Sequence, residues 1–139
     1  MIVNRKLRFE YNVIDTWEAG ISLLGTEVKS IRLGMGSISN AYAIVEDGEV
    51  YLLNMNIPKY KYSATFNHDE FRRRKLLLNA KEIKKMIKAK EKHYTLIPAK
   101  VYFNKRGYAK VTLSLCEGKK QYDKRRAIKE REMKRSQKL

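Results

Sequence analysis

Apolar residues recur at every second position in several short stretches of the chain, the pattern of strands that bury one face. Turn residues join some of these stretches into hairpins, since Asp47-Gly48 supplies the positive φ of a tight turn and residues 104–107 separate the last two stretches. Pro98 predicts an edge or a bulge near the start of its strand. The expected strands cover residues 7–13, 19–24, 42–53 (one hairpin), 75–78, 95–103 and 108–116.

A helical pattern replaces the alternation in two places. At residues 27–34, Thr26 can cap the helix and Gly34 suits the position after its last turn. At residues 80–92, Asn79 can cap and Glu82 stands three residues later, as in a capping box. In this second helix we expect one apolar stripe, formed by Ile83, Met86 and Ile87.

These elements predict a mainly β fold. About six strands, two or three short helices, regular turns and no βαβ repeat favour an antiparallel sheet that closes on itself as a small barrel. A long loop follows Pro58 and interleaves cations with aromatic residues, which either stack on unpaired bases or plug the barrel rim. These aromatic residues are Tyr60, Tyr62, Phe66 and Phe71.

Charge narrows the class of partner. The chain has 139 residues and a net charge of +16, which predicts attraction to a polyanion, with nucleic acid ahead of an anionic membrane. It begins without an apolar run of signal-peptide length and has no stretch of about 18 apolar residues, so we expect a cytoplasmic protein. The single cysteine, Cys116, lies in an apolar alternation and is expected to be a packed side chain.

The charge is concentrated at the end of the chain. Residues 118–139 hold ten basic residues against three acidic ones, a net charge of +7, and show no apolar helical stripe. We therefore expect a folded barrel domain of residues 1–117 and a basic tail of residues 118–139 that is disordered when free and folds on its partner.

Two groups of residues are candidates for chemistry. His68 and Asp69 stand beside arginines, but nuclease catalysis needs partners that this sequence does not supply, and a structural turn is favoured. Glu18 and Glu27 are acids in a basic chain. Each is either an ordinary turn or helix-start residue, or a carboxylate that accepts from base amino groups or orients an arginine on RNA.

Four sequence segments carry a resemblance to a known family: YNVIDTWEAGISLLGTEVKSIRLG, FNHD, RRRKLLL and GKKQYDKR. With them the chain resembles the SsrA-binding protein (SmpB) family over about residues 4–135. The resemblance implies an OB-like closed barrel that binds the tRNA-like domain of tmRNA (SsrA RNA). It also implies delivery to stalled ribosomes with elongation factor Tu and alanylated tmRNA, for trans-translation and peptide tagging. The protein would be a binding protein without enzymatic activity or cofactor.

The same resemblance implies two sets of site residues. The expected tmRNA-facing residues are Asn4, Arg5, Tyr11, Glu18, Lys29, Arg74, Lys75, Leu77 and Lys110. The expected ribosome-facing residues lie in the tail, which would become helical in the decoding centre and the empty mRNA channel: Lys119, Lys120, Tyr122, Asp123, Lys124, Arg125, Ile128, Lys129 and Arg131.

Two departures from the family pattern qualify this assignment. Tyr122 stands where many relatives have histidine, which favours stacking over proton-dependent hydrogen bonding at that position. Glu70 and Arg73 stand where prolines are frequent, so the loop is expected to be more mobile. The alternatives from other classes are a generic OB-fold RNA binder, a membrane-attached basic protein and a metal-dependent endonuclease using His68.

Overall fold

The structure is a computed structural model that describes residues 1–63 and 65–118. Its three described helices are α1 (Leu7–Glu10), α2 (Gly25–Arg32) and α3 (Ala80–Lys90). Its seven described strands are β1 (Ile2–Val3), β2 (Tyr11–Ile21), β3 (Tyr42–Glu46), β4 (Glu49–Leu53), β5 (Arg74–Leu77), β6 (Thr95–Phe103) and β7 (Ala109–Gly118).

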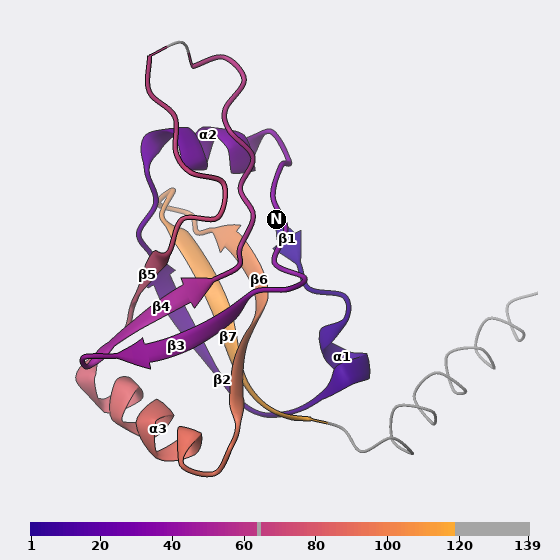
Figure 1. Ribbon diagram of the computed structural model, residues 1–139, viewed down its shortest axis with the longest axis vertical. Helices are drawn as coiled ribbons and strands as arrows, with labels where there is room; N and C mark the ends of the chain where they lie inside the picture. The colour runs from indigo at the N-terminus through magenta and orange to yellow at the C-terminus, as the bar shows by residue number, and fades with distance from the viewer. Residues whose placement is uncertain (64, 119–139) are drawn as a thin grey trace, which may run out of the picture.

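Six of the strands close into a ring. The order is β6-β3-β4-β5-β2-β7, and β7 returns to pair with β6, with every pairing antiparallel. The junction of β3 with β6 is a single residue pair, and the short β1 pairs with the later part of β6. Helices α2 and α3 lie at opposite ends of the ring (Figure 1). The predicted mainly β, OB-like barrel is confirmed.

The interior of the ring is a continuous apolar core. Alternate residues of the strands point inward, including Val50, Leu52, Val101, Val111 and Leu113, which are all fully buried. Each such side chain contributes about 1.5–3 kcal/mol relative to exposure. Because every second side chain points inward, the intervening side chains point outward from the barrel. Most of the candidate residues described below lie at these outward positions.

The hairpin signals in the sequence are confirmed. Asp47 and Gly48 have φ values of 52° and 75°, the left-handed pair of a type I′ turn between β3 and β4. In the β6–β7 turn, the Asn104 side chain accepts from the Arg106 and Tyr108 amides. The bulge expected near Pro98 is present as a register shift between Pro98 and Lys100.

The expected strand at residues 7–13 is wrong in its first half. Residues Leu7–Glu10 form one helical turn, in which the Phe9 and Glu10 amides donate to the Lys6 carbonyl. The alternation there does not mark one buried face, because Leu7 is buried but Val13 is exposed. The expected strand at 19–24 is also not separate, since Tyr11–Ile21 is one strand with a bulge between Val13 and Asp15.

The residues predicted to begin and end the helices are partly wrong for α2 and correct at the start of α3. Gly34 has φ 81° after α2, as predicted, but Thr26 is not the cap, because Leu24 occupies that position and its amide donates to Glu27. In α3, Asn79 accepts from the Glu82 amide at 2.9 Å, as predicted.

The predicted apolar stripe of α3 is wrong at one position. Met86 is fully buried, but Ile87 is 42% exposed, and Ala89 takes its place on the buried face. The reason is geometric: positions 86 and 89 are three residues apart and share a face, whereas position 87 lies about 100° around the helix from position 86.

Candidate nucleic-acid interface

The outer face of β5, β2 and β7 brings together residues that are far apart in the sequence. Gly20 in β2 pairs with Leu77 of β5 on one side and with Lys110 of β7 on the other. Glu18 lies two residues before Gly20 and therefore on the same face. We call this surface, formed by Glu18, Gly20, Leu77 and Lys110, the outer face.

Gly20 allows the strands on either side to come close. A Cβ placed on Gly20 would lie 3.2 Å from the Cβ of Leu77, closer than ordinary side-chain contacts. Leu77 is 55% exposed although it is a large apolar residue. Because Gly20 has no side chain, the surface between Glu18 and Lys110 is shallow and partly apolar. The composition alone suggests a uniformly charged surface instead.

Glu18 has a tyrosine of a neighbouring strand close by. The nearby Glu18 carboxylate, an acceptor for the Tyr102 hydroxyl of β6, raises the pKa of Tyr102. Tyr102 in turn pairs with Lys110 across the β6–β7 ladder, and the Lys100 ammonium lies 5.2 Å from the centre of its ring. A carboxylate acceptor thus lies among cations, which is an arrangement suited to a base amino group flanked by phosphates.

Cations continue from this surface onto α2. Arg32 lies 4.5 Å from the Phe103 ring centre, and its guanidinium comes near Gly107 in the β6–β7 turn. Lys29, one turn earlier, is exposed, with its ammonium 5.6 Å from the Tyr60 ring centre.

Sequence reasoning missed Tyr102, Lys100 and Arg32 as members of this surface. A signal for the first was available, because the turn at residues 104–107 places Tyr102 opposite Lys110 in the hairpin. The position of Arg32 could not be inferred in this way, since it depends on how α2 packs against the end of the barrel.

Lys75 and Arg74, adjacent in β5, have different surroundings. Lys75 points outward and donates to Glu49 at 2.8 Å, in an exposed pair that contributes at most about 1 kcal/mol and can exchange for phosphate. Arg74 is fully buried, and its guanidinium donates to Glu27 at 2.6 Å and to the Met55 carbonyl at 2.7 Å. Arg74 is therefore enclosed by protein in this structure, where it has a structural role, and its expected contact with RNA stays a prediction.

Glu27 is the centre of this buried cluster. Its carboxylate accepts from Arg72 and Arg74 and from the Leu24 amide. Burial raises the pKa of Glu27, but the hydrogen bonds from Arg72, the Leu24 amide and Arg74 outweigh that effect and hold it below its usual value. Glu27 thus orients arginines, but inside the protein, and it cannot accept from a base.

His68 belongs to the same framework. It is 2% exposed, with Nε2 donating to the Ile57 carbonyl at 2.7 Å and Nδ1 2.9 Å from the Thr26 hydroxyl. Because a carbonyl can only accept, Nε2 carries a proton and Nδ1 accepts from Thr26 in the neutral ring. Within residues 1–63 and 65–118, no group of three or more His, Cys, Asp or Glu residues could hold a metal. His68 therefore acts as a structural link between the loop and α2.

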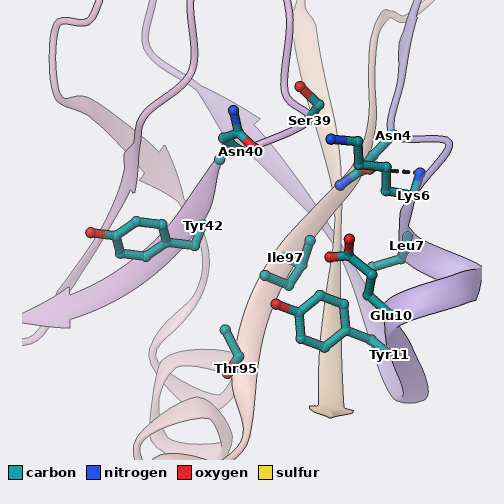
Figure 2. A pocket seen from close by; sticks show the side chains of 11 residues that line it. Asn4, Lys6, Leu7, Glu10, Tyr11, Ser39, Asn40, Tyr42, Thr95 and Ile97 are labelled. Carbon is teal, nitrogen blue, oxygen red and sulfur yellow. Dashed lines mark hydrogen bonds between the residues drawn. The ribbon is translucent and has the colours of Figure 1, made fainter. Parts of the chain in front are cut away.

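Asn4 and Tyr11 lie in a second place, around α1. They line a cavity of about 260 Å³, with Glu10 on their side and Asn40 and Tyr42 on the other (Figure 2). Asn4 itself is buried, donating to the Pro98 carbonyl at 3.2 Å and accepting from the Lys6 amide at 3.2 Å. Its neighbour Arg5 is exposed.

The expected tmRNA-facing residues do not form one site. Gly20 lies nine positions after Tyr11 in β2, roughly 30 Å at 3.3 Å per residue. The outer face and the α1 cavity are therefore distinct surfaces, with Lys29 on α2. The tail residues expected to face the ribosome all lie outside the described residues. Across the part of the chain that the structure describes, no helix is long and apolar enough to cross a membrane.

Comparison with known proteins supplies the family. A family model described as "SmpB protein" matches residues 1–139. An SsrA-binding protein of Chelativorans sp. is 51% identical over 135 residues, which is 96% of this chain and 87% of that protein. One of Sphingopyxis alaskensis is 53% identical over 133 residues, 95% of this chain and 83% of that protein. A solved structure described as "tmRNA-SmpB: a journey to the center of the bacterial ribosome" has a TM-score of 0.72 and 44% identity, covering 91% of this chain and 92% of its own. This chain belongs to the SmpB family.

Proposed function

We propose that this chain binds the tRNA-like domain of tmRNA and delivers it to stalled ribosomes for trans-translation. Family membership supports the proposal, and one structural observation carries it: strand register gathers Glu18, Leu77 and Lys110 on one exposed face. The function is binding and positioning, with no chemical step.

Each residue of the outer face has a role that its chemistry suits. Lys110 is a mobile point charge for a phosphate, and its counterion is released on binding. Glu18, close to Tyr102, accepts from an exposed base amino group or a ribose hydroxyl. Leu77 beside Gly20 offers a flat apolar contact for a sugar or a base edge. Lys29 and Lys75 extend the phosphate contacts to either side.

The proposal divides the chain into the barrel, residues 1–117, and the tail, residues 118–139. The barrel selects tmRNA. The tail enters the decoding centre and the empty mRNA channel, where its cations meet 16S rRNA and Tyr122 stacks on a base. Elongation factor Tu accompanies the alanylated tmRNA, and the process takes place in the cytoplasm.

The role of Glu18 is tested by comparing two substitutions that raise the net charge equally. Glu18→Gln should weaken binding to the tRNA-like domain by about 5- to 150-fold, because a specific acceptor is lost. Glu91→Gln, at the exposed end of α3, should leave affinity unchanged or slightly raised. Mobility shifts at one salt concentration, with an unrelated stem-loop as competitor, measure both. Equal affinity for both RNAs would favour a generic RNA binder instead.

The division is tested by truncation. A chain ending at Gly118 keeps all of β7, including the pairing of Gly118 with Tyr11. It should retain most of its affinity for tmRNA and lose peptide tagging in a translation assay on mRNA that lacks a stop codon. Wholesale loss of tmRNA binding by the truncated chain would show that the tail also selects the RNA.

A further inference from the structure

The connection between β4 and β5 carries a loop tip that is closed at its base. The Tyr60 amide donates to the Asn67 side chain at 3.0 Å, and the Asn67 side-chain amide donates to the Tyr60 carbonyl at 2.8 Å. The Ser63 hydroxyl also donates to the Phe66 carbonyl. We call residues 60–63 and 65–67 the loop tip. It projects beyond α2, away from the barrel (Figure 1).

The two limbs below the loop tip are fastened to each other and to α2. The Ile57 amide donates to the Glu70 carbonyl at 2.9 Å, and the Ser30 hydroxyl of α2 donates to the Pro58 carbonyl at 2.7 Å. His68, buried between Ile57 and Thr26, adds a third link. The loop tip therefore stands on an ordered base, which reduces the conformational entropy that a ligand has to remove on binding.

The loop tip exposes aromatic rings to solvent. Tyr62 is 67% exposed and Phe66 is 61% exposed, at positions where a closed surface loop ordinarily has small polar residues. Tyr60, at the base, packs its ring edge to face with Tyr62 at a centroid distance of 5.5 Å. Exposed rings grouped in this way mark an interaction surface.

Cations lie close to these rings, whereas the acids Asp69 and Glu70 follow the loop tip in the sequence and line a hollow together with Lys59 and Asn67. Lys61 lies 4.9 Å from the Tyr62 ring centre, Lys29 of α2 lies beside Tyr60, and Lys59 is exposed on the limb below. Residues 50–68 contain no Asp or Glu. A second copy of the chain would be repelled by the net charge of +16, whereas phosphates would be attracted.

We propose that the loop tip binds unpaired RNA nucleotides, with Tyr62 and Phe66 stacking on bases and Lys59 and Lys61 contacting the flanking phosphates. Unpaired RNA is favoured over duplex because the bases of a helix are already stacked and present no free face to a ring. This surface is separate from the outer face, and the proposal does not depend on the identity of tmRNA as the cognate RNA.

The test uses the full chain and two fluorescein-labelled probes, a short oligouridylate and a blunt-ended RNA duplex with the same number of phosphates, and measures fluorescence anisotropy at one salt concentration. The double variant Tyr62→Ala/Phe66→Ala should bind the oligouridylate more weakly. Each stacked ring that is lost should lower the affinity by a factor of about 5 to 150. Its affinity for the duplex should change less than about 3-fold, an order-of-magnitude limit for contacts that are mainly to phosphate.

Two controls separate stacking from other effects. Tyr108→Ala removes an equally exposed ring, 65%, from the β6–β7 turn and should leave oligouridylate binding unchanged. Tyr62→Phe/Phe66→Tyr keeps both rings and should bind like the unaltered chain, whereas Phe66→Leu keeps an apolar side chain and should not.

The proposal is overturned if the double alanine variant binds the oligouridylate normally, if leucine replaces Phe66 without loss, or if binding to the duplex is weakened equally. A dimer seen by sedimentation and lost in the double variant would also overturn it, in favour of self-association. Lys110→Ala provides the distinction from the proposed function, since it should weaken tmRNA binding and spare the oligouridylate.

Discussion

Replacing Glu27 by glutamine should lower the free energy of unfolding by about 3–5 kcal/mol at neutral pH. The carboxylate is fully buried and accepts at 2.7 Å from the Leu24 amide, at 2.7 and 3.4 Å from two Arg72 nitrogens and at 2.6 Å from Arg74 Nε. Arg74 is equally buried, so the substitution leaves its positive charge in the core without a counterion and turns a side-chain amide donor toward other donors. For a domain whose total stability is about 5–15 kcal/mol, this is a large fraction.

The same cluster makes part of the stability dependent on pH. The folded-state pKa of Glu27 lies below its ordinary value of 4.5, because the hydrogen bonds from Arg72, the Leu24 amide and Arg74 outweigh the opposing effect of burial. A depressed pKa means that the stabilisation is fully present above about pH 4.5 and is lost as the pH falls through the folded-state pKa. Glu27→Gln should therefore be less stable at pH 7 and should lose part of this acid sensitivity.

Urea unfolding followed by the fluorescence of Trp17 measures both effects, at pH 7 and in a series down to acid pH. Glu46→Gln is the matched control, because Glu46 also pairs with an arginine, Arg73, but on the surface, with about half of each side chain exposed. It should cost less than about 1 kcal/mol. If Glu27→Gln cost no more than Glu46→Gln, the buried carboxylate would not be what compensates Arg74, and the reasoning would fail.

Three further predictions concern the fold. Met86→Ala should cost about 2–5 kcal/mol and its half-exposed neighbour Ile87→Ala less than about 1 kcal/mol in urea unfolding, and equal costs would contradict the observed face of α3. Asn79→Ala should cost about 1 kcal/mol by losing the hydrogen bond from the Glu82 amide, whereas Asn79→Asp should keep it, as thermal unfolding by circular dichroism will show. Burial raises the pKa of Cys116 to about 11, so about one thiol in a thousand is ionised at pH 8, and iodoacetamide should react in concentrated urea but not with the folded chain. Prompt labelling of the folded chain would refute this.

Local signals predicted the elements whose conformation is decided locally. The turn at Asp47-Gly48 requires two positive φ values, and few residue pairs other than this one adopt them readily. Asn79 and Glu82 satisfy each other's backbone amides within one helical turn. Neither depends on the rest of the fold, so most strands, both hairpins and α3 could be predicted from the sequence.

Features that depend on distant partners could not be predicted in this way. Glu27 and Arg74 are 47 residues apart, and only the packing of α2 against the end of the barrel makes them a buried pair. Residues 7–10 alternate in the sequence as a strand does, but Leu7 turns inward against Ile97 and Cys116, which are supplied by β6 and β7. The outer face likewise requires the register on both sides of Gly20.

Glu18 and Glu27 show why burial has to be known before an RNA-binding role is assigned. Both are acids in the same stretch of a basic chain, yet one lies on an exposed face beside Lys110 and the other is sealed in the core with Arg74. A loss at Glu27 or Arg74 reduces the fraction of folded protein, so it weakens binding to every RNA alike and leaves its salt dependence unchanged. A loss at Lys110 removes a phosphate contact and reduces the salt slope by about 1. A change at Glu18 releases no counterion and affects only the preferred RNA, so specificity, salt dependence and stability assign the three kinds of residue to three separate roles.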